Sequence, residues 1–222
     1  MDQLLAGYKR FRARRWIEQR ELFEHLAEGQ TPRILVIACS DSRVDPAQIF
    51  DVAPGELFVV RNVAALVPPC EQGEGLHGTS AAIEFAVDGL GIKTILVMGH
   101  ARCGGVAAAI ERGRWGSKTS AALVNMRFVN AWIDLLAPVV EALAGADLAE
   151  TERGAVQLSL SNLMTFPFVA EKVTSGVLNL EGARFDIATG ALDLYNKARG
   201  WVMATDSLDS TAPEPIAGRS ET

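Results

Sequence analysis

The sequence predicts an α/β fold, in which a mainly parallel central β-sheet is flanked by helices, with an N-terminal helical arm and C-terminal edge strands. Two short, strongly apolar runs, Arg33–Ala38 and Lys93–Met98, are typical of buried parallel strands. A helical pattern comes before the second run, and this β-α-β order favours a parallel sheet with a right-handed crossover. The length of 222 residues, with 49% hydrophobic and 22% charged residues, suits one globular domain.

Residues 2–28 are expected to form the helical arm, which ends before Thr31-Pro32 because proline breaks the pattern. Six basic side chains stand against three acidic ones in residues 1–22, and such a run can bind phosphates or anionic lipid. The apolar residues between them favour a helix with one solvated face instead. The net charge of −6 argues against a general nucleic-acid binder.

The middle of the chain continues the alternation of strands and helices. Leu57–Val60 is expected to be the next strand. Thr79 or Ser80 is expected to cap a mostly apolar helix that runs to about Leu90. The glycine pair Gly104-Gly105 is expected to open another helix directly after the second apolar run.

Two longer helical sections follow. Residues 119–146 carry apolar side chains three or four positions apart, and Pro138 is expected to kink or divide this helix. A further helical section is expected around residues 152–174, where Pro167 interrupts the pattern.

The C-terminal part is expected to complete the sheet and then to lose order. Val177–Leu180 and Arg184–Ile187 are expected to form a hairpin or a sheet-edge pair. Residues 205–222 are rich in Ser, Asp, Pro, Glu and Thr, which is typical of a disordered tail. Residues 1–204 are therefore expected to form a single domain, of which 1–28 are the arm.

The composition also bears on where the protein works. The N-terminus lacks the basic, apolar and cleavage regions of a secretory signal. No apolar stretch approaches the ~20 residues that cross a bilayer. Three cysteines are a poor basis for a disulfide framework, and two of them have a better use. We therefore expect a soluble, cytoplasmic protein.

Two polar segments follow the two apolar runs, and open α/β sheets place their ligands at such strand ends. The first segment is Cys39-Ser40-Asp41-Ser42-Arg43, and an extended conformation there would put Cys39, Asp41 and Arg43 on one side. In the second, His100 and Cys103 are three apart, so one helical turn can bring them to a common face. Two thiols and an imidazole with a free fourth position form a plausible catalytic zinc site.

Asp41 has two competing partners in such a site. It could bind the metal as a fourth ligand and close the site, or Arg43 could hold its carboxylate in a bidentate pair. Three other interpretations stand beside a catalytic zinc site. The zinc could be a closed structural staple, or Cys39 and Cys103 could be small buried hydrophobes. A cysteine nucleophile with a phosphate-binding arginine is disfavoured, because the Cys-x3-Arg spacing is shorter than the Cys-x5-Arg of a phosphatase loop.

At these positions the chain resembles the β-class carbonic anhydrases. The family pattern Cys-x-Asp-Ser-Arg is present at Cys39–Arg43, and Gly-His-x-x-Cys-Gly-Gly is present at Gly99–Gly105. The resemblance covers about residues 28–196. Three further segments resemble, in order, the family's central strand, the helix before the second zinc strand and the closing strands: Pro54–Ala64, Gly78–Val87 and Gly182–Gly190.

The resemblance implies a carbonate dehydratase, a zinc lyase that reversibly hydrates carbon dioxide to bicarbonate and a proton by attack of zinc-bound hydroxide. Zn2+ would be held by Cys39, His100 and Cys103. Asp41 would accept a hydrogen bond from the hydroxide, and Arg43 would hold Asp41. The substrate pocket that the resemblance implies is lined by Gln30, Phe58, Val63, Phe85 and Gly104.

The resemblance also indicates a subtype. A bicarbonate-regulated subtype has Trp three residues before the first cysteine, where this chain has Val36. The open, water-bound site is therefore expected near neutral pH, with Asp41 as a fourth ligand only in a closed form, particularly at lower pH. Phe85 stands where some relatives have Tyr, which removes a hydroxyl from the pocket.

The family implies a homodimer or a larger even homo-oligomer, with the arm crossing to a neighbouring subunit and no nucleic-acid or membrane partner. An enzyme rival is a relative that hydrates another small linear molecule, such as carbon disulfide. A non-enzyme rival is a zinc-bound scaffold in which Asp41 is permanently a ligand. Cys70 has no assigned task, and His25 and His77 are expected to be surface or loop residues.

Overall fold

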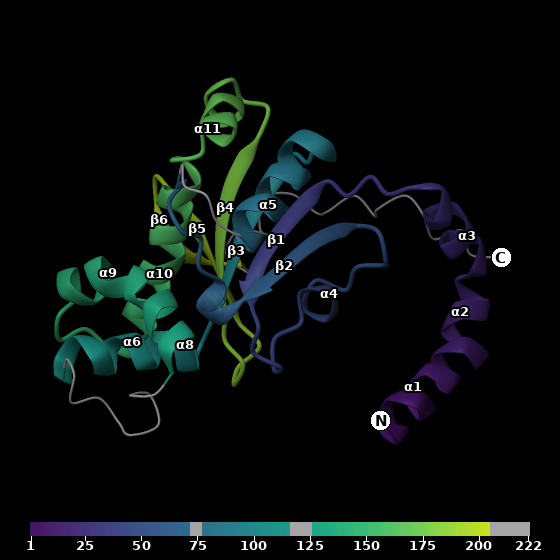
Figure 1. Cartoon of the computed structure of the whole chain (residues 1–222), viewed down its shortest axis with the longest axis horizontal. Helices are drawn as coiled ribbons and strands as arrows, with labels where there is room; N and C mark the ends of the chain where they lie inside the picture. The colour runs from purple at the N-terminus through teal and green to yellow at the C-terminus, as the bar shows by residue number, and fades with distance from the viewer. Residues whose placement is uncertain (72–76, 116–125, 205–222) are drawn as a thin grey trace.

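A six-stranded sheet forms the centre of the computed structural model, which describes residues 1–71, 77–115 and 126–204 (Figure 1). The strand order is β2-β1-β3-β4-β5-β6. The first four strands in this order pair in parallel, and the last two join antiparallel at one edge. The strands are β1 (Ile34–Cys39), β2 (Leu57–Asn62), β3 (Thr94–His100), β4 (Asn179–Phe185), β5 (Leu192–Asn196) and β6 (Gly200–Met203). The predicted fold class is confirmed, with a mainly parallel sheet and antiparallel edge strands.

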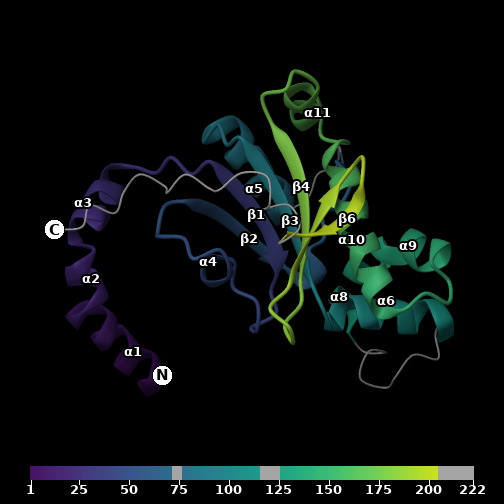
Figure 2. The same ribbon diagram turned by 180° about the vertical axis from the view of Figure 1, so that it is seen from behind.

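Helices flank this sheet, and three of them form the arm. The arm helices extend away from the sheet (Figures 1 and 2), and none of their residues is buried. The helical arm predicted for residues 2–28 is therefore confirmed. The helices are α1 (Asp2–Ala13), α2 (Arg15–Glu18), α3 (Arg20–Glu28), α4 (Pro46–Ile49), α5 (Gly78–Glu84), α6 (Gly104–Trp115), α8 (Arg127–Ile133), α9 (Ala137–Ala142), α10 (Leu148–Leu163) and α11 (Pro167–Thr174), with short turns η1 (Val63–Ala65), η2 (Phe85–Gly89) and η4 (Asp134–Leu136).

The two faces of the sheet are covered differently. Leu35 and Ile37 of β1 point to the face that α5, α10 and α11 cover, and they are fully buried there. Val36 and Ala38 point to the opposite face, where Ile49 of α4 packs against them. Because both faces of β1 are covered by apolar layers, successive side chains along most of the strand are buried. This explains why Arg33–Ala38 is a nearly continuous apolar run.

Helix α10 is seated on β3 and β4 at two positions without a side chain. A Cβ at Gly99 of β3 would lie 2.8 Å from Cγ2 of Val156, and a Cβ at Gly182 of β4 would lie 2.9 Å from Cγ1 of the same valine. These distances are shorter than real Cβ contacts, so both glycines are required for the close approach. The first turns of α10 consequently lie next to the chain that leaves β3.

The predicted hairpin of Val177–Leu180 with Arg184–Ile187 is wrong. Asn179–Phe185 is one continuous strand that pairs in parallel with β3 along its whole length. The hairpin lies later in the chain, between β4 and β5. The Glu181-Gly182 step resembles a turn in sequence, but Gly182 serves the close packing of α10.

Two helix boundaries also differ from the sequence prediction. The helix predicted to begin with a Thr79 or Ser80 cap begins at Gly78, and its N-cap residue His77 makes no side-chain capping bond. That prediction is wrong in its cap, whereas the end near Leu90 is confirmed, where the helix finishes as the π-turn η2. Gly104 is the first residue of α6, as predicted.

Proline divides both long helical sections. Pro138 lies in the first turn of α9, after the 3-10 turn η4, so the predicted division is confirmed. Residues 119–125 of that prediction lie outside the described residues. Pro167 begins α11, and the section predicted around 152–174 is therefore two helices rather than one.

Two further predictions concern the ends of the chain and its surroundings. The predicted disordered tail, 205–222, lies outside the described residues. Within the residues that are described, no helix has both the length and the apolarity to cross a bilayer.

A prediction about stability follows from the seating of α10. Gly182→Ala should lower the free energy of unfolding by about 1–3 kcal/mol, because the added methyl group overpacks the contact with Val156 and Leu160. Gly78→Ala is the matched control, since its Cβ would meet nothing within 4 Å. Urea unfolding monitored by circular dichroism measures both variants. Equal midpoints for the two variants would show that the contact yields without cost.

Candidate metal centre

Three potential metal ligands converge at the carboxyl ends of β1 and β3. Cys39 is the last residue of β1, His100 is the last residue of β3, and Cys103 follows three positions later. Their donor atoms all lie within 4.8 Å of one another, and the two sulfurs are 4.0 Å apart. All three side chains are buried. Among the described residues this is the one group of three or more His, Cys, Asp or Glu side chains with metal-ligand spacing.

The two loops reach this arrangement by turns rather than by the regular conformations expected from the sequence. Strand pairing continues to Ser40, whose N–H bonds the carbonyl of Asn62, and the chain then turns, with the N–H of Val44 on the carbonyl of Asp41. After β3, Arg102 adopts a left-handed backbone with φ of 58°. The extended conformation considered for residues 39–43 therefore ends before the turn at Ser42 and Arg43, and the left-handed Arg102 interrupts the helical turn considered for His100 and Cys103.

The imidazole of His100 is fixed in a tautomer that suits a metal. Its Nδ1 lies 2.9 Å from the carbonyl of Ala101, so Nδ1–H donates and Nε2 is left with its lone pair in the neutral ring. Nε2 is buried and has no hydrogen-bond partner. A buried nitrogen without a partner costs free energy unless something binds it. The donor set therefore fits a metal ion that accepts one imidazole and two thiolates.

The two thiols are hydrogen-bonded to each other, and this bond shifts their pKa values in opposite directions. The hydrogen bond from Cys103, against the opposing effect of burial, lowers the pKa of Cys39 to about 4. The same hydrogen bond, together with burial, raises the pKa of Cys103. A metal that binds both sulfurs must displace the protons that the two thiols hold, so metal binding here is coupled to proton release.

Asp41 lies beside the group but is held by Arg43. The guanidinium donates from Nε to Oδ1 at 2.9 Å and from Nη2 to Oδ2 at 2.6 Å, and the backbone N–H of Arg43 also donates to Oδ1. These hydrogen bonds hold the pKa of Asp41 well below its usual range. Oδ2 of Asp41 is 3.8 Å from Nε2 of His100. The carboxylate therefore faces the donor group while both its oxygens are engaged elsewhere.

Arg61 is a further residue at this site that was not predicted. From β2, its Nε donates to the carbonyl of Cys39 at 2.9 Å, and its Nη2 donates to the carbonyls of Asp41 and Val44, each at 2.6 Å. One side chain thereby fixes the first loop in three places. The available signal was a lone arginine in the apolar run that begins at Leu57.

Glu152 was also not predicted, and it holds the second loop. Its side chain lies on α10 and is buried, with 2% of the residue exposed. Oε1 accepts a hydrogen bond from the backbone N–H of Cys103 at 3.0 Å, and Oε2 accepts from Arg184. The available signal was an acidic residue within the largely apolar pattern of residues 152–174.

The five predicted pocket residues fall into two groups. Val63 is 37% exposed and directly follows Asn62, which is in register with Cys39, and Gly104 directly follows Cys103. A Cβ at Gly104 would meet nothing within 4 Å, so open space lies in front of it. These two residues are beside Cys39 and Cys103. The other three, Gln30, Phe58 and Phe85, are not.

Phe58 and Phe85 pack against each other, with ring centroids 5.8 Å apart, at the amino end of the sheet. Phe58 is in register with Leu35, four residues before Cys39, which corresponds to roughly 13 Å along a strand. Gln30 precedes β1 altogether. Within one chain, these side chains therefore lie at the end of the sheet away from the donor group.

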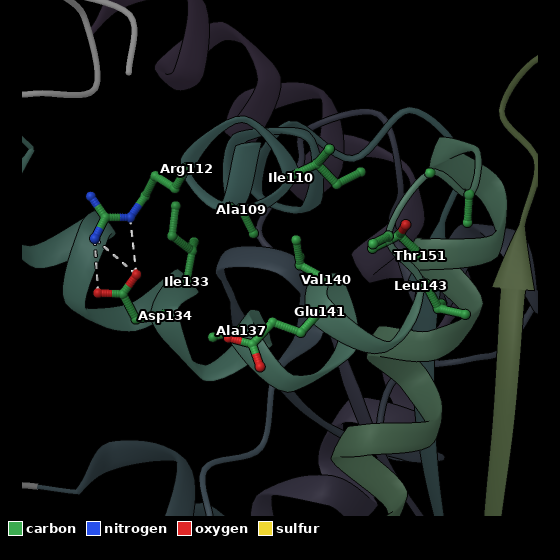
Figure 3. A pocket seen from close by; sticks show the side chains of 14 residues that line it. Ala109, Ile110, Arg112, Ile133, Asp134, Ala137, Val140, Glu141, Leu143 and Thr151 are labelled. Atoms are coloured by element: carbon green, nitrogen blue, oxygen red, sulfur yellow. Dashed lines mark hydrogen bonds and ion pairs between the residues drawn. The ribbon is translucent and has the colours of Figure 1, made fainter. Parts of the chain in front are cut away.

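Two cavities lie apart from the three donors. One, of about 520 Å3, lies between α6, η4 and α9, and the bidentate pair of Arg112 with Asp134 stands at its side (Figure 3). The other, of about 530 Å3, is lined by His77, Val63 and the apolar side chains of α8. None of the donor side chains lines either cavity.

Comparisons with known proteins agree on one family. A family model described as carbonic anhydrase matches residues 34–192, more than half of the chain. The chain is similar to β-carbonic anhydrase 3 of Arabidopsis thaliana, with 34% identity over 88% of this chain and 76% of that protein. It is also similar to the solved structure of the β-carbonic anhydrase CcaA, with 34% identity, a TM-score of 0.76 and coverage of 91% of this chain and 98% of that one.

A further similar structure comes from a description of two tetrameric β-carbonic anhydrases of the filamentous ascomycete Sordaria macrospora. Identity is 31%, the TM-score is 0.73, and the match covers 87% of this chain and 95% of that one. The likeness thus extends over nearly the whole of both chains.

The geometry of the donor group predicts that its thiols set metal affinity. Cys103→Ser should weaken Zn2+ binding by about 100-fold or more, since a lost ligand costs more than the 10- to 100-fold typical of outer partners. Cys70→Ser is the matched control, because Cys70 is half-buried and lies outside the group. Competition with a chromophoric chelator measures both variants. Similar losses in both would place the metal somewhere else.

Proposed function

The chain belongs to the β-carbonic anhydrase family, whose members are carbonate dehydratases of the lyase class, and we propose that it reversibly hydrates carbon dioxide with Zn2+ as its metal. The observation that supports this most directly is the buried group of Cys39, His100 and Cys103 beside a carboxylate that a guanidinium holds. A cytoplasmic location stays a prediction of the sequence.

Cys39, His100 and Cys103 are proposed to hold the zinc, which fits the free lone pair on Nε2 of His100. Zn2+ bound there would supply a water acidified toward neutrality, the nucleophile that adds to the carbon of carbon dioxide. Two thiolates donate more charge to a metal than imidazoles do, so the metal alone would acidify a bound water less. The polar groups around the site would then contribute more to stabilising the ionised nucleophile.

Asp41 is proposed to accept a hydrogen bond from the nucleophile and so to orient it toward the substrate. The carboxylate stays ionised because Arg43 lowers its pKa, so it can act only as an acceptor at neutral pH. Arg43 is proposed to keep Asp41 from becoming a fourth ligand. Its bidentate grip and its further bond to the carbonyl of Arg102, at 3.1 Å, oppose the movement that a closed site would need.

This arrangement favours an enzyme over a zinc-bound scaffold. A scaffold with Asp41 permanently on the metal would have no use for the guanidinium of Arg43. In the structure both oxygens of Asp41 are engaged by Arg43.

The substrate pocket is proposed to be completed by a second copy of the chain. Val63 and Gly104 would form one wall beside the zinc, and Gln30, Phe58 and Phe85 of the partner would form the other. Phe85 is 53% exposed although it is a large aromatic side chain, which suits burial against a partner. A homodimer or a larger even oligomer, with the arm crossing to the neighbour, is the assembly that this pocket requires.

Stopped-flow carbon dioxide hydration tests the proposed function. The zinc-loaded protein should hydrate carbon dioxide rapidly across roughly pH 6.5 to 9, with a rate that rises as the bound water ionises near neutrality. Cys103→Ser, which should lose the metal, is the negative control. No hydration anywhere in this range by the zinc-loaded protein would leave a scaffold or a different small substrate.

Arg43→Ala separates metal binding from activity. The variant should retain zinc but lose most of its hydration rate, about 100-fold or more by analogy with the removal of a single stabilising donor, because Asp41 is then free to close the site. Arg112→Ala is the matched control, since Arg112 makes an equivalent bidentate pair with Asp134 away from the centre. Zinc content by mass spectrometry and stopped-flow rates are the readouts. Full activity in Arg43→Ala would remove the proposed role of the Asp41–Arg43 pair.

A further inference from the structure

The backbone of the loop that carries Cys103 is tied to a different element at each of three consecutive residues. The N–H of Ala101 donates to the carbonyl of Phe185 in β4 at 2.8 Å. The carbonyl of Arg102 accepts from Arg43 of the first loop at 3.1 Å. The N–H of Cys103 donates to Glu152 of α10 at 3.0 Å. The last tie differs from the others, because a buried ionisable side chain makes it.

The carboxylate of Glu152 divides its two oxygens between two tasks. Oε2 accepts a hydrogen bond from Nε of Arg184 at 2.9 Å and forms an ion pair with its Nη2, 2.8 Å away. Oε1 is thereby left for the N–H of Cys103. The side chains of Glu152 and Arg184 are 1% and 8% exposed, so water does not compete for either oxygen.

Arg184 is held in turn from the edge of the sheet. Its Nη1 lies 3.8 Å from Oδ2 of Asp193 in β5, and the same oxygen accepts from Arg153 of α10 at 2.7 Å. Two carboxylates and two guanidiniums therefore alternate from the metal loop to the antiparallel edge. This row of ion pairs leaves the side chain of Glu152 little freedom to turn away from Cys103.

The stability of the fold gives little reason for a buried pair at this position. An ion pair in the interior gains about as much as it loses by desolvation, and apolar residues of similar volume often replace it without cost. The close approach of α10 at Gly99 places Glu152 under the loop, one turn before Val156. What an apolar side chain there could not supply is an acceptor for the N–H of Cys103.

We propose that Glu152 is a positioning residue for the metal centre: by accepting the N–H of Cys103, it fixes the direction of that thiolate toward the metal, and Arg184 orients Glu152 for this task. The inference rests on the metal set of the proposed function but concerns metal binding, not turnover. Outer partners of metal ligands typically account for 10- to 100-fold in affinity.

The test uses Glu152→Gln, which keeps the shape of the side chain and removes one acceptor. Because the guanidinium of Arg184 is charged, it should capture the single amide oxygen, and the amide NH2 would then face the N–H of Cys103. Zn2+ affinity should fall about 10- to 100-fold. The absorption of the Co2+-substituted protein, which reports thiolate ligation and tetrahedral geometry, should change as well. Glu150→Gln is the matched control, an exposed glutamate on the same helix.

The double variant Glu152→Gln/Arg184→Gln distinguishes positioning from a general structural role. The amide introduced at position 184 can accept from the amide NH2 at position 152, whose oxygen then returns to the N–H of Cys103 without any charge. The Zn2+ affinity and Co2+ spectrum of the double variant should recover to within about threefold of the control. If Glu152→Gln does not fold, the double variant alone carries the test by the same threshold.

The proposal is overturned if Glu152→Gln binds Zn2+ as tightly as Glu150→Gln with an unchanged Co2+ spectrum. It is equally overturned if the double variant is about tenfold or more weaker than the control. Neither readout involves carbon dioxide. If the variants show the expected Zn2+ affinities but the zinc-loaded wild-type protein does not hydrate carbon dioxide, the proposed function is contradicted and the role of Glu152 stands.

Discussion

Parallel pairing of β1 with β3 is the constraint on which the metal centre depends. The register runs from Ile34 opposite Thr94 to Ala38 opposite Met98, so the two strands end at the same edge within two residues of each other. Cys39 and His100 are therefore neighbours because of the sheet itself. The third donor, Cys103, reaches them through one left-handed residue, Arg102. A metal bound there joins two strands that the hydrogen bonds of the sheet have already brought together.

Charged side chains fix the loops around the donors. Arg61 holds three carbonyls of the first loop, Arg43 joins the first loop to the second, and Glu152 holds the second from below. Guanidinium and carboxylate groups suit this work, because charge-assisted hydrogen bonds are stronger and more directional than neutral ones. Together these contacts hold the donor side chains in position, so the two loops would lose little conformational entropy when a metal binds.

Residues whose place is marked by a local pattern could be predicted from the sequence, whereas residues that act only through contacts with distant segments could not. Cys39 and His100 could be predicted because each lies at the end of a strand that its own apolar sequence indicates. Arg61 and Glu152 could not, since they act on residues 22 and 49 positions away in the chain. Gly182, between the two segments predicted to form a hairpin, instead lies in a continuous strand and serves the close packing of α10, a distant helix.

The separation of the aromatic pair from the metal within one chain bears on how the enzyme is assembled. Carbon dioxide is nonpolar and needs a dry space beside the proposed nucleophile, but the proposed pocket residues Val63 and Gly104 would supply one wall only, and Val63 is partly exposed. Phe85 is exposed at the other end of the sheet, with no substrate to serve there. In a two-fold interface, the Phe58–Phe85 pair of each copy would lie against the wall of Val63 and Gly104 in the other copy. One interface would then complete two pockets. The proposed even number of subunits would complete every proposed pocket, because a lone chain would leave the proposed nucleophile open to water and Phe85 exposed.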